Sequence, residues 1–227
     1  MNTRYLVLFF VLVLAGLLSC KNNDNVFPKV SYTGITVVNA SADTLNFYLN
    51  GTRQNSASSL FPAGNSGLKI VPSGLQNYQF KKAGRPDVLL SVPLNLTTNT
   101  FNSVYVTGET AASIFKTVDT IPPDTVPLIT SVRFVHAAPD AGNLDVFVGD
   151  TVNFKARAFK STSVFSFTGS GKKEVRIYLS GSAIPIIDTP IIFQANAAYT
   201  LFAKGLLNGK GNSAFNIGIL INQLQPN

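Results

Sequence analysis

Short runs of alternating polar and apolar residues recur along most of the chain. The segments 77–81 and 174–178 alternate strictly, which places one side of each on a core and the other side in water. Such runs return about every ten residues, with Gly, Pro, Asn and Ser between them. Beyond the first 20 residues, no segment sustains a helical period with capping residues. The pattern predicts an all-β protein built as an antiparallel β-sandwich fold.

The chain contains two related halves. Segment 33–43 aligns with segment 130–140, a shift of 97 positions, and the Ser-Gly pair at 73 recurs at 170 with the same shift. Three more pairs of punctuating residues keep it: Pro93 and Pro190, Asn99 and Asn196, Gly108 and Gly205. A repeat of this length indicates duplication of a whole domain. About seven strands in each half fit two tandem immunoglobulin-like sandwiches.

The composition between the halves predicts the domain boundaries. We expect β-sandwich domain 1 over residues 31–121, a Pro-rich linker over 122–128 and β-sandwich domain 2 over 129–227. Three prolines in the linker region favour an extended, semi-rigid backbone. Each copy should have its own core and fold alone.

The N-terminus has the pattern of an export signal. Arg4 precedes an apolar run over residues 5–18 that is too short to span a bilayer, and residues 1–19 read as a signal peptide. The residues around Cys20 resemble the bacterial lipobox, which implies cleavage before Cys20 and its lipidation. Residues 20–30 then form a polar tether. Lys21 after the cysteine resembles the sorting pattern of outer-membrane lipoproteins, so we expect a lipid-anchored cell-envelope protein, facing the periplasm or the surface.

The composition excludes several kinds of protein. With one Cys and one His in 227 residues, neither a disulfide framework nor a Cys/His zinc site is expected. A chain that is 45% hydrophobic and 13% charged is not disordered. The net charge of +7 could serve an acidic partner, but Lys155, Arg157 and Lys160 suit a solvated face better. Nucleic acid is not expected as a partner of an exported protein.

His136, Asp140 and Asp145 form the one acid–base group that the sequence places together. His136 ends a predicted strand and the carboxylates follow across a turn, so the three could bind a ligand or metal, or act in base catalysis. Pro139 and Asp140 also suit the middle of a β-turn. Because the first half keeps an Asp at position 43 but not the His, a structural role is favoured. We therefore expect no catalytic residue, no metal and no cofactor.

The segment 132–148 resembles the opening of the domain of unknown function 4397 family. That family's pattern runs roughly V-R-x-x-H-A-S-P-D-A-P-x-V-D-V-Y, which this segment matches at most of its defining positions. The first half carries a degraded copy, with Asn39 in place of the His. The resemblance implies tandem sandwich domains on secreted or lipid-anchored bacterial proteins, and it implies no activity.

Four Asp-Thr-aliphatic triplets begin at positions 43, 119, 124 and 150. They resemble the O-glycosylation signal of exported Bacteroidetes proteins. The first and last suit strand starts after turns, whereas Thr120 and Thr125 lie beside the prolines between the halves. Because an extended segment is accessible, we expect O-linked glycan on these two threonines.

Together these features favour a non-enzymatic binding or structural module of the cell envelope. Its expected contacts are the membrane, through the lipid anchor, and a polysaccharide or an envelope protein. Two alternatives stay open: a metal-dependent enzyme or hydrolase using His136, Asp140 and Asp145, and a subunit of a larger envelope assembly that pairs through edge strands.

Overall fold

A computed structural model describes residues 30–55, 58–123 and 128–224. The expected signal peptide, Cys20 and most of the tether lie outside the described residues. Within the described ranges, no helix is long and apolar enough to cross a membrane.

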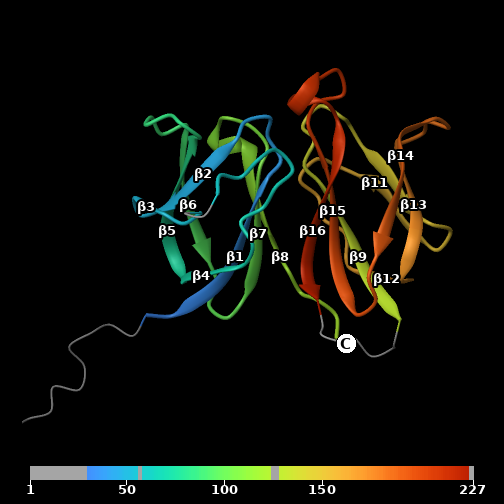
Figure 1. The fold of residues 1–227 in the computed structure, drawn as a ribbon, viewed down its shortest axis with the longest axis horizontal. Coiled ribbons are helices and arrows are strands. Elements are labelled where there is room, and N and C mark those ends of the chain that lie inside the picture. Colours follow the sequence, from blue (N-terminus) through green and yellow to red (C-terminus); the bar gives the residue numbers. More distant parts are fainter. Residues whose placement is uncertain (1–29, 56–57, 124–127, 225–227) are drawn as a thin grey trace, which may run out of the picture. The chain divides into compact units, whose positions relative to one another are not determined.

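The first half consists of eight strands and one short 3-10 turn (Figure 1, blue to green). These elements are β1 (Tyr32–Asn39), β2 (Leu45–Leu49), β3 (Thr52–Arg53), β4 (Lys69–Pro72), β5 (Gly74–Lys82), β6 (Leu90–Leu96), β7 (Phe101–Val106), η1 (Ala111–Ser113) and β8 (Ile114–Val118).

The second half repeats this series (Figure 1, yellow-green to red). Its elements are β9 (Ile129–His136), β10 (Leu144–Val148), β11 (Val152–Arg157), β12 (Ser166–Gly169), β13 (Gly171–Leu179), β14 (Pro185–Phe193), β15 (Ala197–Lys204), η2 (Gly211–Ser213) and β16 (Asn216–Leu224).

Each half contains two four-stranded sheets with the same strand order. The orders are β4-β1-β7-β8 and β3-β2-β5-β6 in the first half, and β12-β9-β15-β16 and β11-β10-β13-β14 in the second. Every strand of the first half thus has a counterpart eight strands later. The expected all-β fold of two tandem sandwich-like halves is confirmed.

One strand pair in each half departs from the antiparallel pattern that the sequence suggested. Strand β1 pairs with β7 in parallel, and β9 pairs with β15 in parallel. A parallel pair needs a long crossover between its strands. Here the other strands of the same half supply that connection. The alternation of side chains has the same period in both kinds of pairing, so it could not reveal the direction.

The shift of 97 positions holds in the backbone geometry as well as in the sequence. Gly34 pairs with Phe101 in the first half, and their counterparts Ser131 and Ala198 pair in the second. Asn99 and Asn196 both have left-handed backbones, with φ of 57° and 55°. Asn is among the few side chains that tolerate this conformation, which explains why both copies retain it.

Each half has its own hydrophobic core. The first core is centred on these buried residues: Ile35, Val37, Leu45, Phe47, Tyr78, Phe80, Leu96, Val104 and Val106. The second is centred on these: Val132, Phe134, Leu144, Val146, Val175, Ile177, Phe193, Tyr199 and Leu201. In both halves, alternate residues of the facing strands point inward, as in other two-layer β structures.

A third cluster, called the junction cluster here, joins the two halves. Its buried members are Val38, Ala40, Tyr105, Val135, Ala137, Phe202 and Leu220. Six of them are three counterpart pairs at the shift of 97, so the two copies meet largely through the same positions. The rings of Tyr105 and Phe202 lie edge to face at 5.9 Å. Strands β1, β7, β9 and β15 are therefore buried on both faces, which explains their nearly continuous apolar sequence.

The strands of the two halves span 32–118 and 129–224, and independent folding of the halves stays a prediction. A fragment of residues 122–227 should give a β-type circular dichroism spectrum and a cooperative urea transition, because it retains the second core. Its free energy of unfolding should be lower than that of the whole protein, since Val135, Phe202 and Leu220 lose their cover and Arg133 loses Asp119. Loss of cooperativity in the fragment would show that the two cores form one folding unit.

Candidate functional site

His136 holds the loop that follows β9. Its side chain is fully buried. The ring Nε2 lies 2.7 Å from the carbonyl oxygen of Gly142, and the backbone N–H of Ala138 donates to Nδ1 at 3.3 Å. Since Nδ1 accepts, the hydrogen belongs on Nε2, which donates to Gly142. Both ring nitrogens are thus used to fix the backbone of residues 138–142.

Asn39 makes the equivalent hydrogen bonds to the loop that follows β1 in the first half. The backbone N–H of Ser41 donates to Asn39 Oδ1 at 3.0 Å, and Asn39 Nδ2 donates to the carbonyl oxygen of Asp43 at 2.7 Å. Each of the two side chains accepts from the residue two positions later and donates to a carbonyl further along the loop. A carboxamide therefore replaces the imidazole without loss of the loop contacts, which supports a structural role for this position.

Burial lowers the pKa of His136 below its usual range, although the hydrogen bond to Gly142 acts in the other direction. Desolvation disfavours the charged imidazolium. The rings of Phe134 and Phe159 lie 6.4 and 6.0 Å from the imidazole, centre to centre. His136 is therefore neutral at physiological pH, as its accepting Nδ1 also requires.

The two carboxylates are likewise engaged with the backbone. Asp140 accepts from the backbone N–H of Leu207, at 3.1 and 3.2 Å for its two oxygens. Asp145 accepts from the N–H of Ala156 at 2.7 Å and from the hydroxyl of Ser180 at 2.8 Å. Burial alone would raise the pKa of Asp145, but these bonds and Lys155 together hold it below its ordinary value.

His136, Asp140 and Asp145 thus bind separate partners. Among the described residues, no three His, Cys, Asp or Glu side chains come together in a way that could hold a metal ion. The basic residues Lys155, Arg157 and Lys160 also have separate partners, and Arg157 Nη2 donates to the carbonyl oxygen of Thr162 at 2.5 Å. Lys155 lies over the ring of Phe147 at 4.1 Å, whereas Lys160 Nζ donates to the carbonyl of Ala112 in the first half at 2.6 Å.

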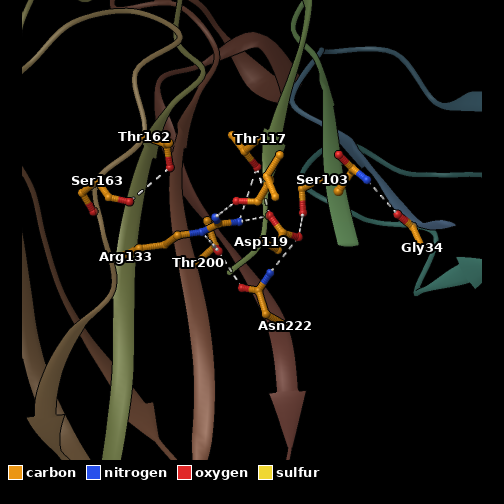
Figure 2. A network of polar contacts seen from close by, with 11 residues as sticks. Gly34, Ser103, Thr117, Asp119, Arg133, Thr162, Ser163, Thr200 and Asn222 are labelled. Carbon is orange, nitrogen blue, oxygen red and sulfur yellow. Dashed lines mark hydrogen bonds and ion pairs between the residues drawn. The ribbon is translucent and has the colours of Figure 1, made fainter. Parts of the chain in front are cut away.

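A second polar group, which the sequence analysis missed, lies at the junction of the halves. Figure 2 shows Arg133 reaching from β9 to Asp119, which follows β8. Both side chains are more than nine-tenths buried. Asp119 also accepts from the hydroxyls of Ser103 at 2.6 Å and Thr117 at 3.1 Å. The carboxylate is therefore fixed from several sides.

All three nitrogens of the Arg133 guanidinium donate hydrogen bonds. Besides Asp119, its Nε donates to Thr200 Oγ1 at 2.8 Å, and its Nη1 donates to the carbonyl oxygen of Val118 at 3.2 Å. Thr200 in turn donates to Asn222 Oδ1 at 2.5 Å, and Asn222 Nδ2 donates to Asp119 at 3.4 Å. The network thus links β8, β9, β15 and β16, and it crosses from one half to the other (Figure 2).

A cavity of about 270 Å³, called the junction cavity here, opens beside this network. Its polar lining residues are Thr36, Asn65, Asn102, Asp119 and Asn222. Its apolar walls are the following side chains: Leu68, Phe101, Ile121, Leu220 and Ile221. A concave apolar space with a few fixed polar groups is the usual form of a small-molecule site. We take it as the candidate site.

The comparison with protein families concerns the second half. Residues 130–225 match the family model described as Domain of unknown function (DUF4397). The suspected resemblance of this half is confirmed. The matched segment begins in β9 and contains Arg133 and His136, but Asp119 lies before it. The buried arginine of the matched segment therefore has its carboxylate partner in the preceding half.

No curated protein matches the chain. Three solved structures are similar to this chain at low TM-scores. A carbohydrate-binding module of family CBM26 from Eubacterium rectale, crystallised with maltoheptaose, is 9% identical, with 84% of this chain and 98% of that chain covered and a TM-score of 0.27. A leucine-rich repeat protein from Bacteroides thetaiotaomicron is 14% identical over 74% of this chain and 24% of that chain, with a TM-score of 0.17. A protein described as a candidate for cell adhesion, from Bacteroides eggerthii, is 8% identical, with 88% of this chain and 97% of that chain covered and a TM-score of 0.20.

The expected modification sites fall at the edges of the described ranges. Thr120 is exposed and directly follows buried Asp119. Thr125 and Cys20 lie outside the described residues. Glycosylation of the two threonines and lipidation of Cys20 stay predictions.

The shared role of His136 and Asn39 predicts the behaviour of His136→Asn. Because the pKa of folded His136 is depressed, the unfolded chain binds a proton first, below about pH 6.5. The stability from neutral His136 should be present above that pH and fall as pH decreases toward the folded pKa, with a slope of at most about 1.4 kcal/mol per pH unit. Urea titrations between about pH 5 and 7 should show this slope in the wild type and a flatter dependence in His136→Asn.

His136→Ala should lose more stability than His136→Asn, since it leaves both loop contacts unmade. An equal slope in wild type and His136→Asn would show that another group titrates in this range.

Proposed function

We propose that this protein is a lipid-anchored, non-enzymatic binding module of the cell envelope and that its ligand occupies the junction cavity. The junction cavity itself supports the proposal best. It lies between two halves that are fixed to each other by a buried cluster and a buried ion pair, so its walls are formed before any ligand arrives. A preformed site loses little conformational entropy on binding.

The chemistry of the lining favours binding over catalysis. Asp119 is the acidic group of the cavity, and its two oxygens already accept from Arg133, Ser103, Thr117 and Asn222, so they are engaged in the junction network instead of facing a substrate. The three residues of the rival enzyme hypothesis, His136, Asp140 and Asp145, are bonded to loop and strand backbone instead. Their contacts support structural roles.

The proposed location depends on the N-terminal segment. If Cys20 is the lipidated N-terminus of the mature chain, it anchors the module to the outer membrane, and several acyl chains give stable attachment. The partner is then a component of the envelope, a polysaccharide or a membrane-associated protein.

The anchor has its own prediction. In the native host, the mature protein should begin at Cys20, carry acyl chains and sediment with the outer-membrane fraction. Cys20→Ala should leave the precursor unprocessed or release the protein from the membrane, because the sulfur that accepts the lipid is absent. Intact-mass spectrometry of the two forms distinguishes these states. An unmodified Cys20 in the membrane fraction would contradict the proposed anchor, whatever the cavity binds.

The binding function predicts that blocking the cavity reduces capture of envelope material. Thr36 lines the cavity, and the larger, neutral side chain of Thr36→Met should fill part of it. Soluble protein carrying Cys20→Ala should retain a polysaccharide or protein component of solubilised envelopes, and Thr36→Met should reduce that retention about tenfold. Phe167→Ala is the control, because Phe167 is half exposed on β12 and does not line the cavity. Equal retention by the Thr36→Met protein and the control would refute binding at the junction cavity.

A further inference from the structure

The junction has two sides that the repeat relates: the first side lies at β1 and the second side at β9. Different side chains fill them. Thr36 on β1 is the counterpart of Arg133 on β9. Thr36 pairs with Ser103 and Arg133 pairs with Thr200, and Ser103 and Thr200 are counterparts too. Leu68 precedes β4 as Phe165 precedes β12. On the second side, Arg133 lies with its guanidinium carbon 4.8 Å from the centre of the Phe165 ring. On the first side, the side chain of Thr36 is too short to fill the equivalent space, which remains as the junction cavity.

The protein's own Arg133 therefore shows what kind of group suits this position. It is a flat group that lies against an apolar side chain and donates to a hydroxyl, a carbonyl and a carboxylate. The counterparts of the first two acceptors are Ser103 Oγ and the carbonyl of Ile221. A ligand in the cavity that follows this pattern presents several hydrogen-bond donors on one edge and an apolar face.

The charge of the ligand follows from the counterpart of the carboxylate. Val118 pairs with Asn102, and Ile221 pairs with Tyr199, the counterpart of Asn102, so Val118 and Ile221 occupy equivalent positions. The residues that follow them, Asp119 and Asn222, are therefore counterparts. The first side therefore has a neutral carboxamide where the second has a carboxylate. A second cation would lie close to Arg133, and an anion would meet Asp119 with no Lys, Arg or His among the lining residues. Burying either uncompensated charge is costly, so the cavity favours a neutral ligand.

Phe101 supplies the apolar surface. Its ring lies on Gly34, where an added Cβ would approach the ring Cδ1 to 2.5 Å and Leu68 Cδ1 to 3.0 Å. The absence of a side chain at position 34 thus lets both wall residues approach the backbone of β1 closely. Phe101 remains 51% exposed, which leaves part of its ring available. The volume of about 270 Å³ is just below the range of about 300 Å³ and more that is typical of drug-sized ligands. It suits one ring rather than a long chain.

We propose that the junction cavity binds one neutral sugar ring, as a free monosaccharide or as the end or branch of a polysaccharide. The apolar face of the ring lies on Phe101, and its hydroxyls donate to Asn222 Oδ1, which accepts one other bond, and to the nearby backbone. This inference rests on the proposed binding function and specifies its ligand.

The test uses soluble protein with Cys20→Ala and a panel of defined probes. Methyl glucoside, methyl galactoside and N-acetylglucosamine are the neutral sugars, and glucosamine and glucuronate are cationic and anionic rings of similar size. Binding is measured by saturation-transfer NMR and by calorimetry. At least one neutral sugar should bind about tenfold more tightly than either charged ring. Melting curves confirm that each protein used is folded.

The variants locate the bound sugar. Phe101→Ala should weaken it about tenfold or more, because the apolar surface is lost, and Thr36→Met should weaken it by filling the space. Phe167→Ala is closely matched, since Phe167 is 50% exposed against 51% for Phe101, and it should leave binding unchanged. If Phe101→Ala does not stay folded, Ile221→Ala replaces it, since Ile221 is a half-exposed wall residue.

The possible results separate this inference from the proposed function. Preference for glucosamine or glucuronate, or neutral-sugar binding that survives both cavity variants, overturns the neutral-sugar assignment. If no sugar binds while Thr36→Met still reduces capture of envelope material, the ligand assignment fails and the binding function stands. If Thr36→Met changes neither measurement, both fail.

Discussion

The arrangement of the two halves depends on one buried ion pair, between Arg133 and Asp119. Taking two charges out of water is costly, and their attraction offsets that cost only when the geometry is good and the remaining hydrogen-bonding groups are satisfied. Here Thr200, Val118, Ser103 and Thr117 supply those further bonds. Removing one partner of such a pair generally costs about 3–5 kcal/mol, because the other charge is left buried. Packings of the halves that separate Arg133 from Asp119 while keeping either one buried are therefore disfavoured.

The duplication explains both the symmetry of the junction and its exception. Val38 with Val135, Ala40 with Ala137 and Tyr105 with Phe202 keep similar character in the two copies, as expected where equivalent surfaces meet each other. Thr36 and Arg133 differ in size, and Asp119 and Asn222 differ in charge. The polar part of the junction is thus the part in which the copies diverged, and the junction cavity lies beside it.

Periodicity indicated the strands and the class of fold, and residues matched at one constant shift indicated the duplication. The shift of 97 positions reappears in strand pairing, in the left-handed asparagines and in the loop contacts of Asn39 and His136. The direction of the β1–β7 and β9–β15 pairs could not be read from the sequence, because side chains alternate identically in parallel and antiparallel strands. Because Asp43 is kept in the first half, the sequence favoured a structural role for the group of His136, Asp140 and Asp145, and the backbone contacts of these side chains support that role.

The junction network was harder to find because it joins residues that no local pattern connects. One signal was present: in β9, Arg133 lies on the same side as Val135, opposite Val132 and Phe134. An arginine on a strand that is apolar on both sides indicates a second buried face and requires a partner, since charged side chains are almost never fully buried alone. The sequence does not say that the partner is Asp119, because that contact depends on how the two halves pack.

The same packing makes the cavity a consequence of the network rather than an accidental gap. Arg133 needs Asp119 at the junction, and holding Asp119 there brings the end of β8 close to β16 through Asn222. On the second side the arginine fills the space that this spacing creates, and on the first side Thr36 is too short to do so. Closing the first side would require a larger residue at position 36 or a shift of the halves, and the shift would disturb the ion pair. A rigid, partly polar opening therefore persists beside the network, and the interaction that fixes the two halves also fixes the shape of the site.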